Sequence, residues 1–188
     1  CDWSSDVCSS DLRDRADGRN LEFVEIYNSQ DWSEDISGFR LSGDIDYAFP
    51  TNTTLGARSY LLVAASPADI QAVYGVVTTH AFTGNLPNDK GRVRLRNRQD
   101  AVVVEVNYDT EPPWPAAPDG AGHSLVLARP SFGEANPFAW GSSDQIGGSP
   151  RTNETARSNP FQTVMINEIF AHTDPPQIRS EEHTSELQ

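Results

Sequence analysis

The sequence predicts an all-β fold, an antiparallel β-sandwich with one short helix. Apolar and polar residues alternate in short runs, turn-forming residues separate these runs, and only one segment has helical spacing. About seven short strands separated by turns are typical of two packed antiparallel sheets.

The first expected strands lie between Leu21 and Pro50. In Val24–Ile26 and again in Phe39–Leu41, two apolar residues flank a charged one, which is the pattern of a half-buried strand. A third run, Asp46–Pro50, ends at a proline, a residue that favours an edge or a strand end.

The middle of the chain contains the most apolar strand and the only expected helix. Ser59–Ala65 is apolar on both faces, so we expect a central strand that is covered on each side. Ser66 stands at a capping position before Pro67, and helical spacing continues to Gly75. A short helix should therefore follow this strand directly.

A hairpin and one further strand are expected after the helix. Arg92–Asn97 and Val102–Tyr108 are separated by the turn-like residues Arg98–Ala101. Two apolar pairs should face each other across this hairpin: Val93 and Leu95 with Val104 and Val106. Asp119-Gly120 then predicts a turn into a last strand at Ser124–Arg129.

The domain organisation follows from a change in composition after the sandwich, which we place at residues 13–140. Residues 141–161 are rich in Gly, Ser, Asn, Pro and Thr, which indicates a flexible linker. Residues 162–178 contain another strand-like run, Val164–Phe170, which ends before a pair of prolines.

The two ends of the chain are expected to be artefacts. The last ten residues can be encoded by a DNA sequence whose reverse complement encodes most of the first twelve, and both resemble a translated sequencing-library adapter. We therefore interpret residues 1–12 and 179–188 as adapter-derived and leave them out of the fold prediction. Both cysteines, Cys1 and Cys8, lie in the first of these segments, so the remainder offers no disulfide.

Charge and hydropathy exclude two classes of partner. The chain has a formal net charge of -13, and it stays acidic when the two ends are set aside. An acidic surface repels phosphate backbones, so we expect no nucleic-acid partner. The longest apolar run is far shorter than a membrane span, so we expect no membrane insertion.

Several short motifs, in order, resemble one known family. The motifs are FVEIYN (Phe23 to Asn28), ISGFRLS (Ile36 to Ser42), YAFP (Tyr47 to Pro50), SYLLVA (Ser59 to Ala64) and DGAGHSLVL (Asp119 to Leu127). Over residues 21–150 the sequence is similar to the bacterial lamin-tail domain, and the similarity depends on the order and spacing of the motifs. This resemblance implies an immunoglobulin-like β-sandwich of the kind found in secreted or surface proteins of bacteria.

The sequence departs from this family at its first strand. Members usually open with a strand of the form VINEI, which the charged residues 13–20 cannot supply. The run Val164–Ile169, VMINEI, has this form at the other end of the chain. It either opens the next copy of a tandem repeat, which the linker favours, or completes this domain as a donor strand. We predict that it docks into the slot left by the missing strand.

These observations predict a domain that functions by contacting other molecules or domains. We predict a non-catalytic extracellular or cell-surface module for adhesion, spacing or ligand contact within a larger multidomain bacterial protein. The alternative is an accessory domain of a secreted enzyme, such as a hydrolase, a nuclease or a spore-coat-kinase-like unit, whose catalytic part lies elsewhere. Expected partners are neighbouring domains of the parent protein and a surface polymer or protein ligand, with no cofactor.

The candidate contact residues are three arginines and one tryptophan. Arg92, Arg94 and Arg96 alternate with other residues, which places positive charges on one strand face. They could bind an anionic glycan or phosphate, or pair with nearby carboxylates, and we favour pairing. Trp114 could belong to an exposed aromatic patch, although packing in the core or at its rim is the stronger expectation.

No catalytic or metal site is expected. Gly122-His123-Ser124 lacks the second glycine of a nucleophile elbow and begins a strand. Asp44 and Asp46 lack the regular ligand spacing of a calcium loop. His80 and His172 have no partners at metal-ligand spacing, so surface or turn positions are expected for them. Glu25 and Glu168 are interpreted as outward-facing strand residues, with a partly buried carboxylate as the alternative.

Overall fold

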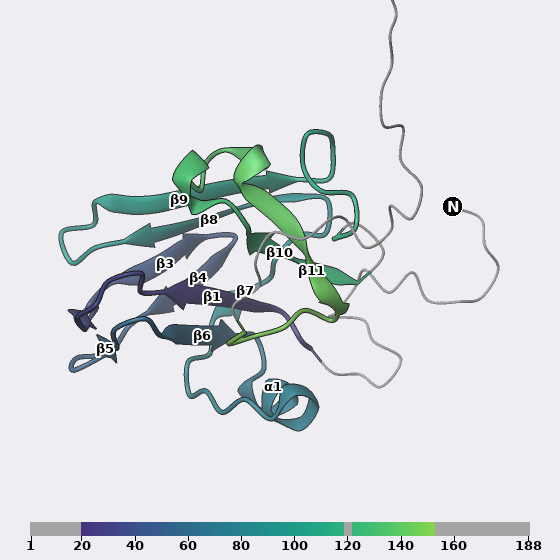
Figure 1. Cartoon of the computed structure of the whole chain (residues 1–188). Coiled ribbons are helices and arrows are strands. Elements are labelled where there is room, and N and C mark those ends of the chain that lie inside the picture. The colour runs from purple at the N-terminus through teal and green to yellow at the C-terminus, as the bar shows by residue number, and fades with distance from the viewer. Residues whose placement is uncertain (1–19, 119–121, 153–188) are drawn as a thin grey trace, which may run out of the picture.

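The computed structural model describes residues 20–118 and 122–152. Its regular elements are β1 (Phe23–Tyr27), β2 (Glu34–Asp35), β3 (Arg40–Gly43), β4 (Ile45–Ala48), β5 (Thr54–Leu55), β6 (Tyr60–Ala64), α1 (Pro67–Tyr74), β7 (Thr83–Gly84), β8 (Lys90–Arg96), β9 (Val102–Asp109), β10 (His123–Leu127), η1 (Pro130–Phe132), η2 (Pro137–Ala139) and β11 (Trp140–Ile146). They form antiparallel sheets with one short α-helix, as the sequence predicts (Figure 1).

The strands form two layers. One layer is a five-stranded sheet in the order β7-β4-β3-β8-β9. The other contains two antiparallel pairs, β1-β6 and β10-β11, and β2-β5 is a further short pair. The predicted β-sandwich is therefore confirmed.

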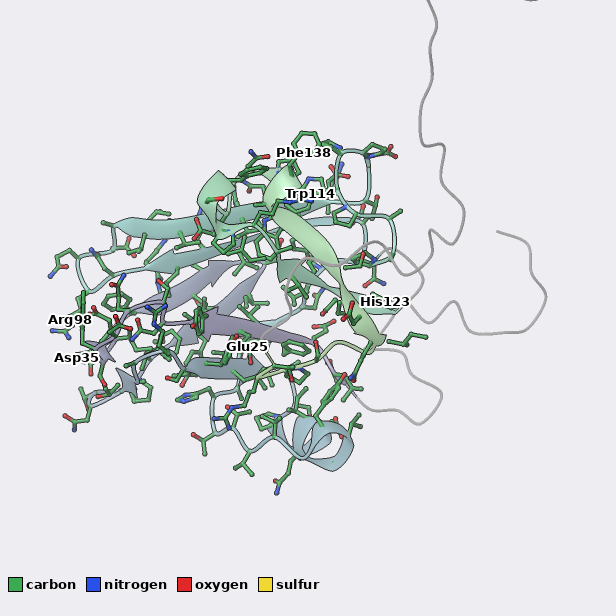
Figure 2. The ribbon with its side chains drawn as sticks, in the orientation of Figure 1. Glu25, Asp35, Arg98, Trp114, His123 and Phe138 are labelled. Carbon is green, nitrogen blue, oxygen red and sulfur yellow. The ribbon has the colours of Figure 1, made fainter. Side chains whose placement is uncertain are left out.

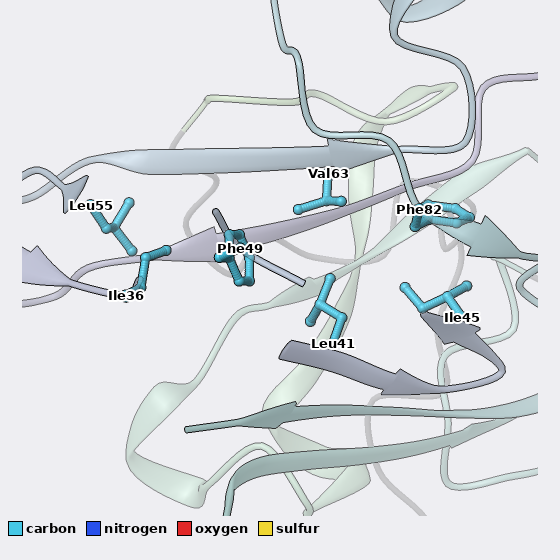
Figure 3. Close-up of a cluster of buried hydrophobic side chains, with 7 residues drawn as sticks. All are labelled: Ile36, Leu41, Ile45, Phe49, Leu55, Val63 and Phe82. Atoms are coloured by element: carbon cyan, nitrogen blue, oxygen red, sulfur yellow. The ribbon is translucent and has the colours of Figure 1, made fainter. Parts of the chain in front are cut away.

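The main hydrophobic core lies between β3–β4 and the β1-β6 pair. Its buried members, drawn in Figure 3, are Ile36, Leu41, Ile45, Phe49, Leu55, Val63 and Phe82. Val24 and Ile26 of β1 pack against this cluster from the second layer. Each fully buried aliphatic side chain of this cluster stabilises the fold by about 2 kcal/mol relative to exposure.

The strand β6 is covered on both faces, as its apolar sequence predicts. Val63 belongs to the main core, whereas Leu62 and Ala64 form a second buried cluster with Ile70 of α1. The helix itself has the predicted ends. The Ser66 hydroxyl accepts a hydrogen bond from the Asp69 amide, and Gly75 has the left-handed conformation that ends many helices.

The β8–β9 hairpin also has the predicted register. Val93 lies opposite Val106, and Leu95 lies opposite Val104. The Asn97 side chain accepts hydrogen bonds from the amides of Gln99 and Ala101, which fixes the turn between the strands. The four apolar side chains of the two pairs therefore share one face of the five-stranded sheet.

The structure differs from the sequence prediction after residue 140. Residues 141–146, expected to belong to a linker, form most of β11, which pairs with β10. Polar contacts hold this strand, because the buried Ser143 hydroxyl accepts from the Ser124 amide and donates to the Gln145 carbonyl. A prediction based on apolar alternation does not detect such a strand.

Several sequence predictions lie outside the described residues. These are the turn at Asp119-Gly120, the later part of the predicted linker, the run Val164–Ile169 with His172 and Glu168, and the two segments interpreted as adapter-derived, residues 1–12 and 179–188. They remain predictions.

Candidate functional site

The structure contains an apolar groove of about 620 Å³ between β1 and β10. Its lining includes the four apolar residues that face inward on the β8–β9 hairpin. Residues of β1 and the run Ser124–Leu127 of β10 also line it. The groove therefore lies over the part of the five-stranded sheet that the β1-β6 pair does not cover.

One wall of the groove is the backbone edge of β1. The Asn28 amide donates to the Ser59 carbonyl, and the Glu22 carbonyl accepts from the Ala65 amide, so these residues direct their backbone groups toward β6. Neighbouring residues of an antiparallel strand direct theirs to opposite sides. The N–H and C=O groups of Phe23, Glu25 and Tyr27 consequently face away from β6, toward the groove.

The described residues supply no strand partner for this edge. Among them, β1 pairs only with β6, and β10 pairs only with β11. Both pairs are thus two-stranded where the structure describes them, and the groove separates β1 from β10. An extended segment lying in the groove would join them into one continuous sheet.

The chain crosses one end of the groove after β11. Gly148 is buried with φ +85°, and a Cβ atom there would lie 3.3 Å from the Phe23 ring and 2.9 Å from the Ser124 hydroxyl. Only glycine fits between β1 and β10 at this point. The Arg151 amide then donates to the Glu25 carboxylate at 2.7 Å, and Thr152 lines the groove.

Glu25 is a carboxyl group of the groove whose pKa is raised (Figure 2). Burial raises the pKa of this side chain to about 7, and the hydrogen bond from the Arg151 amide partly opposes the shift. The structure thus favours the partly buried carboxylate over the outward-facing residue that strand alternation suggests. Its half-buried position beside an open edge makes the protonation of Glu25 sensitive to whatever lies in the groove.

The predicted arginine face of β8 lies on the opposite side of the sheet and is paired with carboxylates. Arg94 forms an ion pair with Glu105 across the hairpin. Arg96 donates to the Asp100 carbonyl and to the Ser42 hydroxyl, and its guanidinium lies 3.5 Å from the Asp100 carboxylate. Pairing, the reading that we favour for this face, is thus observed for Arg94 and Arg96.

The same face extends to neighbouring charges. Hydrogen bonds from Arg94 and then Asn107 lower the pKa of Glu105, and the charge of Arg92 contributes less. Beyond β8, Arg98 pairs with Asp35, whose pKa falls to about 2 because Ser37 and then Arg98 donate to it (Figure 2). These cations already have anionic partners, which lowers their capacity to bind a further anion.

Trp114 packs at the rim of the groove. Its ring is half-buried and lies 6.3 Å, between centroids, from the ring of Trp140, a residue that lines the groove. The structure therefore does not bring Trp114 together with Arg92, Arg94 and Arg96 in one site. More exposed aromatic residues, which the sequence reading did not single out, are Trp32, Phe132 and Phe138.

His123 and Ser124 do not form a nucleophile site. His123 is buried, and its Nδ1 lies 2.6 Å from the Ser143 carbonyl oxygen, to which an N–H at that nitrogen donates. Ser124 is the second residue of β10, at the register shift between His123 and Leu125, and its amide donates to the Ser143 hydroxyl. His80, expected at a surface or turn, is half-buried, and its Nδ1 lies 2.6 Å from the Tyr47 hydroxyl.

The part of the chain that the structure describes holds neither a metal-ligand cluster nor a membrane-spanning helix. Within it, no group of three His, Cys, Asp or Glu side chains could hold a metal ion. No helix among these residues has the length and apolar character needed to cross a bilayer.

A comparison with protein families identifies the class of this domain. The model of the Lamin Tail Domain family matches residues 4–110, more than half of the 188-residue chain. The chain belongs to this family, whose members have an immunoglobulin-like, non-enzymatic fold. The match includes β1 to β9 and ends before β10 and β11. Searches of curated proteins and of solved structures found no match.

Proposed function

We propose that this chain is a non-catalytic β-sandwich module of an extracellular or cell-surface protein, and that it acts by contact with an extended polypeptide segment. The observation that carries this proposal is the groove between β1 and β10. It offers apolar side chains below and, at its side, the edge of β1 that has no strand partner among the described residues. These are the two features that β-strand addition uses. A segment bound in this way links the module to another part of its parent protein, which is a spacing or adhesive role.

The chemistry of the groove favours a polypeptide over a polymer of sugars or phosphates. The four residues beneath it are aliphatic, and the N–H and C=O groups of Phe23, Glu25 and Tyr27 face it. Backbone groups of this kind pair with another backbone at the regular spacing of a sheet. The arginines of β8 are on the other face, where Arg94 and Arg96 already contact carboxylates.

Hydrogen exchange at the free edge of β1 tests the proposal. Exchange of the Phe23, Glu25 and Tyr27 amides is measured by NMR in the full chain, alone and with a ten-residue peptide of sequence FQTVMINEIF. We expect these amides to exchange at least about a hundredfold more slowly than in an unstructured peptide, in one condition or both, because a strand hydrogen bond must open before exchange.

The matched control is the same peptide with proline in place of its central isoleucine and its glutamate, since proline removes the donors that a strand needs. The proposal is wrong if all three amides exchange at unstructured rates in the free chain and also with the peptide at saturating concentration. Protection that the proline peptide induces equally well would also contradict strand addition.

A further inference from the structure

We infer that the segment that occupies the groove is the run Val164–Ile169 of the same chain, bound as a strand between β1 and β10. This inference rests on the proposed function, because it names the partner of the same groove. In this position the run would join β6-β1 and β10-β11 into one five-stranded sheet opposite the other five-stranded sheet. The domain would then be closed by a strand that follows it in the sequence.

The tether places this run within reach of the groove. The described chain arrives at the groove at Arg151, whose amide contacts Glu25, and at Thr152, which is part of the lining. Eleven residues, 153–163, connect Thr152 to Val164. Extended chain spans about 3.3 Å per residue, so this connection can run the length of the groove and return, in either strand direction.

A short tether also gives the run an advantage over free partners. An attached segment has an effective concentration of about a millimolar or more when its linker can span the distance. A segment of another molecule has this advantage only at comparable concentrations of the whole protein. The run Val164–Ile169 of the same chain is therefore the favoured occupant of the groove.

The residues of the run suit a covered position between two strands. Val164 and Ile166 lie on one face of an extended chain, and Met165 and Ile169 on the other. Aliphatic side chains on both faces are typical of a strand that is buried on each side. The run has six residues, close to the length of the two strands that it would join, β1 and β10, which have five each.

The segment immediately before β1 fits the groove less well. Residues 13–20 read RDRADGRN, and an apolar groove would bury several of their charges. Burial of a charge without a partner is strongly unfavourable. A strand from a second copy of the chain has the right residues but lacks the tether, so it is the competing outcome of the test.

The first test compares two matched substitutions in the full chain. Ile166→Asp places a charge in the run, whereas Ile146→Asp places the same charge at a residue of β11 that is 68% exposed. We expect the Phe23, Glu25 and Tyr27 amides to be protected in the unmodified chain and in Ile146→Asp. In Ile166→Asp their exchange should accelerate by about a hundredfold, because the strand that covers them is released.

The second test locates the run directly. In methyl-labelled full chain, nuclear Overhauser contacts are expected between Ile166 or Ile169 and the methyl groups of Val104 or Val106. A mixed sample of two differently labelled populations separates contacts within a molecule from contacts between molecules. Contacts found only between molecules would show a second copy in the groove, and absence of any contact would place the run elsewhere; either result overturns the inference.

Failure of the inference can be told apart from failure of the proposed function. If the β1 edge is unprotected in the free chain but becomes protected when the peptide FQTVMINEIF is added, the groove accepts strands and only the choice of occupant is wrong. If the edge is protected in the free chain and Ile166→Asp leaves it protected, another segment fills the groove and the inference again fails. If the edge is never protected, both fail.

Discussion

The two halves of the five-stranded sheet are covered differently. Over β3 and β4, Leu41 and Ile45 are each 1% exposed beneath the β1-β6 pair. Over β8 and β9, Val104 and Val106 are equally apolar but only half-buried, and they line the groove. The apolar face of the five-stranded sheet thus extends beyond the part that the β1-β6 pair covers. Such an uncovered apolar face indicates that a further element packs on it.

The largest expected effect is on the free energy of unfolding, when the same Val→Ala substitution is made in each half of the sheet. Val63→Ala removes a fully buried side chain of the covered half and should lower the free energy of unfolding by about 2.5 kcal/mol. In the chain that carries Ile166→Asp, whose groove is open, Val104→Ala should lower it by about 1 kcal/mol less, because part of that side chain is then in contact with solvent. Urea denaturation of the two variants measures both values.

Combination with Ile166→Asp sharpens this comparison. The effect of Val63→Ala should add to that of Ile166→Asp, because Val63 is not among the residues that line the groove. The effects of Val104→Ala and Ile166→Asp should overlap by at least about 0.5 kcal/mol if the run covers Val104. Full additivity at Val104 would argue against a strand above it.

A smaller effect on the free energy of unfolding is expected at Asn28, the residue that follows β1. Asn28 is buried, and its amide nitrogen donates to the carbonyls of Trp32, Leu55 and Gly56 while its oxygen accepts from the Gln30 amide. Asn28→Ala leaves these groups without partners and should lower the free energy of unfolding by about 2 kcal/mol.

The matched control for Asn28 is Asn107→Ala, at an exposed residue of β9 whose amide donates to Glu105. This control should change stability by less than about 0.5 kcal/mol. Equal effects of the two alanine variants in urea denaturation would contradict a structural role for Asn28 in holding β1.

A different kind of effect concerns the pH dependence of the groove. Burial raises the pKa of Glu25 from 4.5 to about 7 in the folded state, so the folded protein binds this proton more tightly than the unfolded chain does. The stabilisation is complete below pH 4.5 and is lost as the pH rises through about 7. Glu25→Gln should therefore reduce the fall in stability between pH 5 and pH 8.

Thermal unfolding across this pH range measures the change, with Glu111→Gln as the control at an exposed position. The two variants should differ in the slope of stability against pH. A wild-type slope retained in Glu25→Gln would show that another group causes the dependence.

The sequence predicts the elements whose side chains have a regular pattern. Val24–Ile26 and the β8–β9 hairpin have the two-residue period of strands, and Ser66 with Gly75 marks the ends of the helix. The family-like motif FVEIYN ends at Asn28. The structure explains the asparagine at this position, because its side chain donates hydrogen bonds to three loop carbonyls. Local pattern and local hydrogen bonding were sufficient for these parts.

Other parts depend on contacts between distant residues. β11 is held by its pairing with β10 and by the buried Ser143. Neither produces an alternation of apolar and polar residues in the sequence. The two-residue strands β2 and β5 are too short to show any period. The groove arises only when β1 and β10 are placed above the hairpin, so its lining could not be found from the sequence, although the missing first strand suggested that a slot exists.

The positions of Asn20 and Arg151 have a consequence for how this module fits into a longer protein. Asn20 precedes Glu25 by five residues, at most about 17 Å of extended chain, and Arg151 contacts Glu25 directly. The polypeptide therefore enters and leaves the described sandwich beside one strand (Figure 1). A unit with adjacent entry and exit points can be inserted into a loop of another domain without pulling that loop apart.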